Sequence, residues 1–136
     1  MDSLIIERKL DSLQRSLARV TQKCPPDVHT LLDDADLQDI VVLNLSRAVQ
    51  LCVDIGTHCL TNHPALSPPN TMGETFDRLA EAGVISDALG ERMKKPVGFR
   101  NLAVHNYAAL DMAIVHAIAT RHVEDFRQFA QAVAAA

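Results

Sequence analysis

Hydrophobic residues recur every three or four positions along most of this chain, the spacing that places them on one face of an α-helix. The pattern predicts helices over residues 2–23, about 36–60, 73–82, about 112–133 and a segment that starts at Ser86. No segment alternates hydrophobic and polar residues as a half-buried strand does. The sequence therefore predicts one domain over residues 1–136, an all-α, up-and-down bundle of four to five helices.

The second helix is expected to lie at the centre of the bundle. One stripe holds Val41, Leu45, Ala48, Cys52, Ile55 and Cys59, and further apolar residues such as Leu43 widen the surface on neighbouring faces. A helix that is apolar over so much of its circumference usually contacts several others. Asn44, Arg47 and Asp54 interrupt it. They are either boundary residues bonded across helices, or Asn44 and Arg47 support a site or a dimer seam.

Polar and turn-forming residues mark where these helices begin and end. Residues 27–35 are acidic and predict a loop with at most one short turn. The segment Thr61–Thr71 contains three prolines and is the clearest loop. Gly83 is expected to follow the third helix as its left-handed capping residue. Ser86 and Asp111 are expected to cap the starts of the two helices after it.

The two later helices carry more specific expectations. Pro96 cannot donate a backbone hydrogen bond, so we expect it to kink the fourth helix or to open it locally. Gly98, two residues later, weakens the helix further. The last helix is expected to run unbroken and to bury the residues that keep the helical period, which are Ile114, Ile118, His122, Phe126, Phe129 and Val133.

Composition narrows the class of protein without naming a function. Apolar residues make up 48% of the 136 positions and charged residues 22%, as in a soluble globular domain. The apolar runs are too short to span a bilayer, and the N-terminus lacks the pattern of a signal peptide. Cys24, Cys52 and Cys59 are an odd number without a CxxC spacing, which favours reduced thiols. We therefore expect a cytoplasmic protein with no membrane contact.

The net charge of −4 hides one local concentration of basic residues. Arg92, Lys94, Lys95 and Arg100 place four of the 13 basic residues inside nine positions. Any contact with a polyanion is expected to be local, and the first three are candidates to contact RNA phosphates. The alternative is that they form a solvated helix face.

Two side chains in the same segment have the chemistry for metal-free cleavage of RNA. Histidine titrates near pH 6.5 when unperturbed, so His105 can remove the proton of a 2′-hydroxyl group. The planar guanidinium of Arg100 can stabilise the charge that grows on the phosphorane. On a straight helix the two side chains point about 140° apart, so they meet only if the helix ends between them or a second chain completes the site. The alternative is that His105 simply caps a helix C-terminus.

A longer string carries a resemblance to a known family. Val97-Gly98-Phe99-Arg100-Asn101-Leu102-Ala103-Val104-His105-Asn106-Tyr107 follows Met93-Lys94-Lys95. It resembles the Arg-x-x-x-x-His-x-Tyr signature of the HEPN superfamily and, within it, of the HepT-like toxins. The likeness extends to the segments Gly83–Ser86 and Val123–Phe126 and covers almost the whole chain. Pro96 departs from the pattern, because many members carry methionine there.

The resemblance implies a function as well as a fold. It implies a homodimer whose paired motifs form a metal-independent endoribonuclease cleft, with Arg100 and His105 as catalytic residues and Asn101 supporting them. It implies an RNA substrate such as tRNA or mRNA. It also implies an MntA-like antitoxin, a minimal nucleotidyltransferase that silences the toxin by transferring AMP to the motif tyrosine, here Tyr107. A bulky anion two residues from His105 would repel the RNA backbone.

The sequence is also compatible with two other functions and contains one further cluster of metal-ligand residue types. The chain could be a non-catalytic HEPN module that binds a nucleotide or regulates a partner nucleotidyltransferase, or a generic helical dimerisation domain. The acidic net charge favours the first of these over an enzyme. His58, Cys59 and His63 lack a second pair at ligand spacing, so we expect neither a metal site there nor a cofactor.

Overall fold

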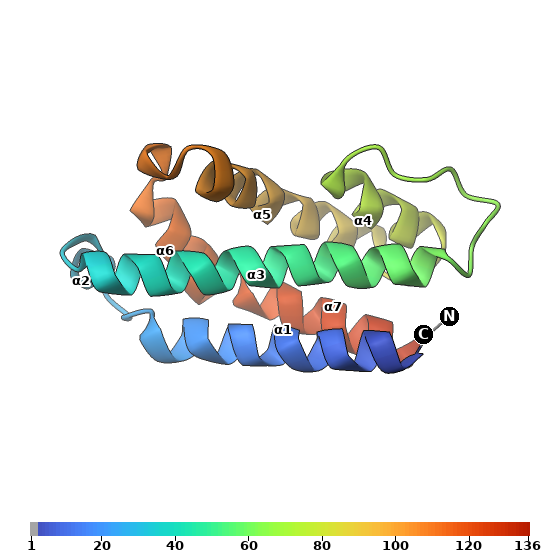
Figure 1. Cartoon of the computed structure of the whole chain (residues 1–136), viewed down its shortest axis with the longest axis horizontal. Coiled ribbons are helices and arrows are strands. Elements are labelled where there is room, and N and C mark those ends of the chain that lie inside the picture. The colour runs from blue at the N-terminus through green and yellow to red at the C-terminus, as the bar shows by residue number, and fades with distance from the viewer. Residues whose placement is uncertain (1–2) are drawn as a thin grey trace.

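The computed structural model describes residues 3–136, and within that range it contains seven α-helices, one short 3₁₀-helix and no strand (Figure 1). The elements in chain order are α1 (Ser3–Lys23), α2 (Val28–Leu32), α3 (Ala35–Leu60), α4 (Met72–Glu81), α5 (Asp87–His105), η1 (Tyr107–Ala109), α6 (Met112–Arg121) and α7 (Val123–Ala135). The predicted all-α bundle is confirmed. There are more helices than expected because the acidic segment forms α2 and the last helix divides in two.

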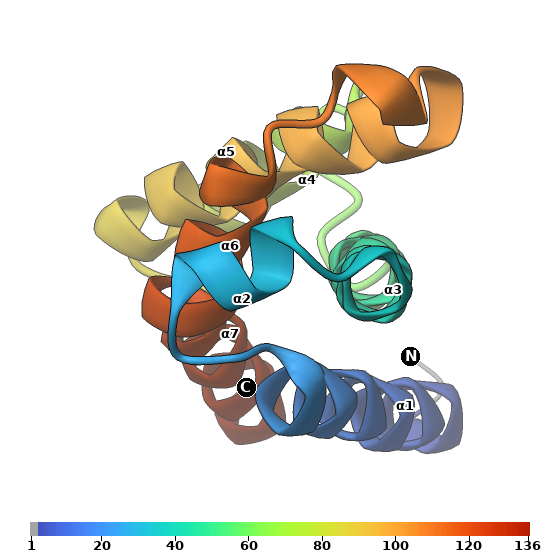
Figure 2. The ribbon, with the colours of Figure 1, turned by 90° about the vertical axis from the view of Figure 1, so that its left-hand side faces the viewer.

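The central position predicted for the second helix is confirmed for α3. Its whole predicted stripe, from Val41 to Cys59, is buried, and α3 contacts every other α-helix of the described chain. Figure 2 looks along the bundle and shows α1 beneath α3, with α7 beside α1 and α4 and α5 above. One apolar core runs from Ile6 on α1 to Val133 on α7, so the helices share a single interior.

The central helix is also long and apolar enough to span a membrane by length and composition alone. Within the bundle, 56% of the 18-residue apolar stretch of α3 that passes this test is buried. Burial among the other helices explains its hydropathy. One prediction for this helix is wrong: Leu43 is 50% exposed, because it lies on the outer face of α3 and not beside the buried stripe.

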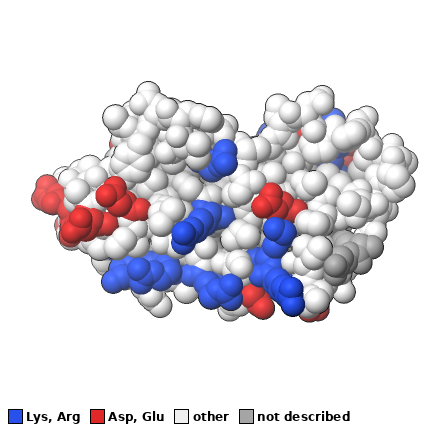
Figure 3. All heavy atoms as spheres, in the orientation of Figure 1, with Lys and Arg blue, Asp and Glu red and all other residues white. Residues whose placement is uncertain are grey.

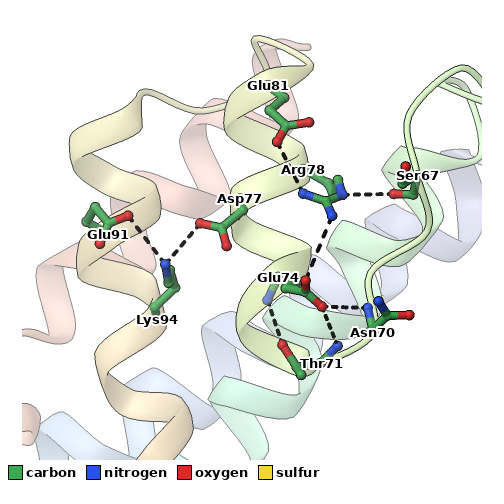
Figure 4. A network of polar contacts seen from close by, with 9 residues as sticks. All are labelled: Ser67, Asn70, Thr71, Glu74, Asp77, Arg78, Glu81, Glu91 and Lys94. Atoms are coloured by element: carbon green, nitrogen blue, oxygen red, sulfur yellow. Dashed lines mark hydrogen bonds and ion pairs between the residues drawn. The ribbon is translucent and has the colours of Figure 1, made fainter.

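Helices α4 and α5 form a hairpin whose ends the sequence marks clearly. Gly83 has a φ of +77°, the left-handed conformation predicted for the residue after α4. The Ser86 hydroxyl accepts a hydrogen bond from the Leu89 backbone N–H at 3.1 Å and caps α5. Thr71 and Glu74 cap α4 with a reciprocal pair of hydrogen bonds (Figure 4). The Thr71–Glu74 cap fixes the start of α4, which borders the candidate site.

Helix α5 runs unbroken through Pro96 to His105. The local opening expected at the proline does not occur, because Pro96 is buried among residues of α6 and α7 and tertiary packing holds the helix. Leu89, Met93 and Val97 form the inner stripe of α5, and all three are buried. The end of α5 and η1 lie above the first half of α3 (Figure 1).

The last predicted helix is interrupted at His122, which ends α6 and precedes α7. Asp111 caps its start as predicted, accepting from the Ala113 N–H at 2.9 Å. Two of the residues expected on the inner stripe are not buried: Ile114 is 57% exposed, and His122 lies at the turn, where its side chain is also exposed. The break changes the chain direction, so that α6 packs on α2 while α7 packs along α5 and α1.

Candidate active site at the end of helix α5

Arg100 lies on the inner face of α5, three residues after the buried Val97. Its side chain is half-buried and reaches the start of α4, where Nη1 lies 3.8 Å from the sulfur of Met72. The same nitrogen donates a long hydrogen bond of 3.4 Å to the Asn101 side-chain oxygen. Its Nε is buried and has no hydrogen-bond partner in residues 3–136. The guanidinium is therefore positioned by packing, and the nitrogen left to bind an anion is Nη2, which has no hydrogen bond in residues 3–136 and is not among the buried atoms.

His105 is the last residue of α5 and is exposed. No hydrogen bond or ion pair to its ring occurs within the described chain. The backbone N–H of Asn106 still bonds to the Leu102 carbonyl at 2.8 Å, so the helix is intact up to its final residue. The imidazole is thus available to solvent and to a substrate, and nothing in its own protomer occupies it.

Because α5 is continuous from Arg100 to His105, the two side chains are separated by about 140° around the helix and about 7.5 Å along it. Arg100 points toward the bundle and His105 away from it. One protomer therefore does not bring them together as a pair in direct contact. Val104 follows Arg100 by one helical turn and lies on the same face of α5, but it is 55% exposed, so this face packs toward the bundle only as far as Arg100.

Tyr107 is joined to α3 by a contact that the sequence did not reveal. Its hydroxyl donates a hydrogen bond of 2.5 Å to the carboxylate of Asp39, which lies 68 residues earlier in the chain. Partial burial and the nearby Asp39 carboxylate raise the pKa of Tyr107 to about 12. The ring remains 40% exposed. No local sequence signal could have identified Asp39, because the contact depends on how η1 lies over α3.

Ion pairs hold two of the three side chains predicted to contact RNA phosphates. Arg92 donates from Nε to the Asp125 carboxylate at 3.0 Å. Lys94 lies 3.1 Å from Asp77 (Figure 4), and that carboxylate raises the pKa of Lys94. Lys95 is exposed and has no partner in the described part of the chain. The charges of Arg92 and Lys94 are therefore compensated within the protein, whereas that of Lys95 is not.

The remaining cysteines and histidines are mostly structural. Cys52 and Cys59 are buried in the α3 stripe, and burial raises the pKa of both thiols. All three cysteines are free thiols. His116 bonds through Nε2 to the Pro25 carbonyl at 2.9 Å and so ties α6 to the loop before α2. Asn44 donates to the Ile40 carbonyl at 2.9 Å within α3, so this bond lies inside one helix and not across two helices, as one interpretation of Asn44 had expected.

The fold and the Arg-x-x-x-x-His-x-Tyr string together place the chain among the HEPN-type helical bundles. A family model for ribonuclease HepT-like proteins matches residues 13–133. The chain belongs to this HepT-like family. It is 36% identical over 131 residues to the mRNA nuclease HepT of Shewanella oneidensis, an alignment that covers 96% of this chain and 97% of that protein.

Solved structures show the same architecture. A toxin–antitoxin complex with AMP-PNP matches with a TM-score of 0.88 at 35% identity, covering 97% of this chain and 98% of its own. The tri-AMPylated HEPN toxin of Shewanella oneidensis in complex with an MNT antitoxin matches with a TM-score of 0.87 at 36% identity, over 97% and 98%. YutE, a cytosolic protein of Bacillus subtilis, matches at 0.85 but is only 16% identical, so it shows the fold alone.

Proposed function

We propose that this chain is the ribonuclease toxin of a toxin–antitoxin pair and that it cleaves RNA without a metal ion in the cytoplasm. The observation that carries this proposal is the end of α5, where an arginine with free donor capacity and an unpartnered histidine lie on one continuous helix. Membership of the HepT-like family supports it, as does the likeness to a protein named mRNA nuclease HepT.

The chemistry follows from the two side chains. The imidazole of His105 accepts the proton of the 2′-hydroxyl as that oxygen attacks the adjacent phosphorus. The Arg100 guanidinium stabilises the added negative charge on the phosphorane oxygens, and Asn101 holds the guanidinium in place. The bond to the 5′-oxygen then breaks, and that oxygen takes a proton from a protonated imidazole. The products are a 2′,3′-cyclic phosphate and a free 5′-hydroxyl group.

A homodimer completes the site in this proposal, because one protomer holds Arg100 and His105 on different sides of α5. Three exposed apolar or aromatic side chains lie on elements that pack together at this end of α5: Leu43 on α3, Val104 on α5 and Tyr107 on η1. Leu43 lies one helical turn after Asp39, the residue that binds Tyr107. A two-fold contact through this side brings both His105 residues to one cleft, one as base and one as acid.

The proposed partner is a minimal nucleotidyltransferase antitoxin that modifies Tyr107. The related HEPN toxin is tri-AMPylated in its complex with an MNT antitoxin. Transfer of AMP to Tyr107 places a phosphodiester beside the Asp39 carboxylate and two residues from His105. The added negative charge repels the RNA backbone and blocks the cleft.

The deciding experiment compares RNA cleavage by purified wild type, His105→Ala and Arg100→Ala in EDTA. Loss of the base and of the charge stabiliser should each lower the rate by at least about 100-fold. His122→Ala is the matched control, since His122 is also an exposed histidine and lies away from the site, and it should cleave like wild type. Equal cleavage by all variants contradicts the assignment, and loss of wild-type cleavage in EDTA contradicts the metal-free mechanism.

A further inference from the structure

A groove between α1 and α3 carries three arginines and lies outside the site described above. It encloses about 460 Å³. Arg15 and Arg19 line it from α1 and Arg47 from α3, and all three side chains are exposed. Its floor includes the buried polar residues Ser16 and Asn44. The groove is therefore open, polar and basic, unlike the apolar cavities that bind small hydrophobic ligands.

The positive charge of this groove is not neutralised by neighbouring acids. Arg15 donates to the Ser12 hydroxyl at 3.0 Å, which leaves its charge uncompensated. The side chains of Arg19 and Arg47 have no hydrogen bond or ion pair within residues 3–136. The one acid in the lining, Asp54, bonds to Gln50 at 2.9 Å and pairs with Lys9 at 3.8 Å. These arginines thus differ from Arg92 and Lys94 on α5, whose charges are satisfied internally.

Basic residues continue beyond the groove along one face of α1. Arg8, Arg15 and Arg19 recur at positions i, i+7 and i+11, so they share one face of the helix over about 16 Å. Figure 3 shows that lysine and arginine side chains gather over α1 and the middle of α3, while acidic side chains gather at the α2 end of this face. A chain with a net charge of −4 thus presents a locally basic surface.

We propose that this groove binds the sugar–phosphate backbone of single-stranded RNA beside the cleavage site. The proposal rests on the ribonuclease function proposed above. Arginine presents a planar fork of donors that matches phosphate oxygens. No aromatic residue lines the groove, so it offers no platform on which bases could stack. The contact is therefore with the backbone and carries little sequence preference.

The position of the groove along α3 connects it to the candidate active site. Arg47 follows Asp39 by eight residues, which is about 12 Å along α3. Asp39 binds Tyr107 at the end of the motif. A strand of RNA whose scissile phosphate lies at His105 therefore reaches the groove within a few nucleotides. The face of α3 that carries Arg47 also carries Leu43 of the proposed dimer contact.

Binding to a 2′-O-methyl oligonucleotide tests the groove separately from catalysis, because this probe lacks the nucleophilic hydroxyl group. The double variant Arg19→Gln/Arg47→Gln removes two unpaired guanidinium groups. The slope of log affinity against log salt concentration should fall in magnitude by about 1.4, since each lost phosphate contact of a single strand contributes about 0.7. With cleavable RNA, KM should rise while kcat stays unchanged, because neither residue touches the reacting atoms.

The matched control is Arg121→Gln/Arg127→Gln, which removes the same charge from exposed positions on α6 and α7. It should leave the slope within error of wild type. Equal slopes for the groove variant and the control overturn the proposal. The proposal is also overturned if the slope falls for Arg92→Gln/Lys94→Gln and not for the groove variant. It is overturned as well if the groove variant loses binding to the antitoxin and keeps its binding to the oligonucleotide. A wild type that binds the oligonucleotide but cleaves no RNA refutes the ribonuclease function and leaves the groove intact.

Discussion

Tyr107 offers an optical probe of the candidate site, because it is the only tyrosine and the chain has no tryptophan. Its hydroxyl bonds to Asp39, and partial burial together with that carboxylate raises the pKa of Tyr107 to about 12. The folded-state pKa of Tyr107 lies above the ordinary tyrosine pKa of 10.0, so the neutral phenol is the form that folding favours. The resulting stabilisation is complete below about pH 10 and is lost as the pH rises through about 12.

Ultraviolet titration of the tyrosinate should therefore show one transition near pH 12 in the wild type. In Asp39→Asn the carboxylate charge is removed, so the transition should move toward the ordinary pKa of tyrosine, near 10. Asp36→Asn is the control, because Asp36 is another acid on α3 and has no contact with Tyr107 in the described chain. An unchanged transition in Asp39→Asn would show that the hydrogen bond does not govern the titration.

At the scale of single residues, the sequence supplied Arg100, Asn101, His105 and Tyr107 because they form a local motif. It could not supply Asp39 or Met72, which meet the motif through packing between distant helices. It also could not distinguish satisfied charges from free ones. Lys94 belongs to the most basic segment of the sequence, yet its charge is paired with Asp77 on α4 (Figure 4).

Among the elements, the contact between α3 and α4 depends on one glycine. A Cβ atom at Gly56 would lie 2.7 Å from a Thr75 carbon and 2.8 Å from a Leu79 carbon. Both of those side chains are buried, so neither has room to move aside. The absence of a side chain at Gly56 therefore sets how closely α4 approaches α3. Met72, the contact of Arg100, is the first residue of the same helix α4.

Gly56→Ala should consequently lower the free energy of unfolding by about 1–3 kcal/mol, the usual cost of overpacking a well-packed core. Gly98→Ala is the matched control on α5, where a new Cβ would meet no atom within 4 Å. The control should stabilise the protein by up to about 1 kcal/mol, because alanine has the higher helix propensity. Chemical denaturation measures both. Equal effects of the two substitutions would refute this account of the α3–α4 contact.

The helices were predictable from the sequence wherever local signals and the apolar period agreed. The stripe of α3 and the caps at Ser86 and Asp111 are examples. The break at His122 was not predictable, because positions 118, 122 and 126 keep a helical period across it. Only tertiary packing decides that α6 turns to α2 while α7 stays beside α5. Packing likewise holds α5 together at Pro96, against its local preference.

For the whole molecule, the side formed by α3, α5 and η1 is the proposed dimer surface. Leu43→Glu places a charge where Leu43 is 50% exposed in the protomer, at a position outside the catalytic motif. The desolvation cost of that charge should turn the dimer into a monomer. The monomer should lack ribonuclease activity although every motif residue is intact. Light scattering and RNA cleavage measure the two effects on the same sample.

Ile114→Glu is the control for this variant, since Ile114 is 57% exposed but lies on α6. It should remain a dimer and stay active. A Leu43→Glu protein that is dimeric and active would place the interface elsewhere. One that is monomeric and fully active would show that a single protomer holds a complete site.

Because α5 is unbroken, the number of residues between Arg100 and His105 determines the relative orientation of their side chains. Each residue added or removed between Arg100 and His105 turns everything beyond it by about 100° and moves it about 1.5 Å along the axis. There is no hinge between the two residues to absorb such a change. A one-residue insertion would therefore swing His105 to another side and also pull Tyr107 out of register with Asp39. The positions of His105 and of Tyr107 both depend on the length of α5, so a change in this helix that displaces one of them also displaces the other.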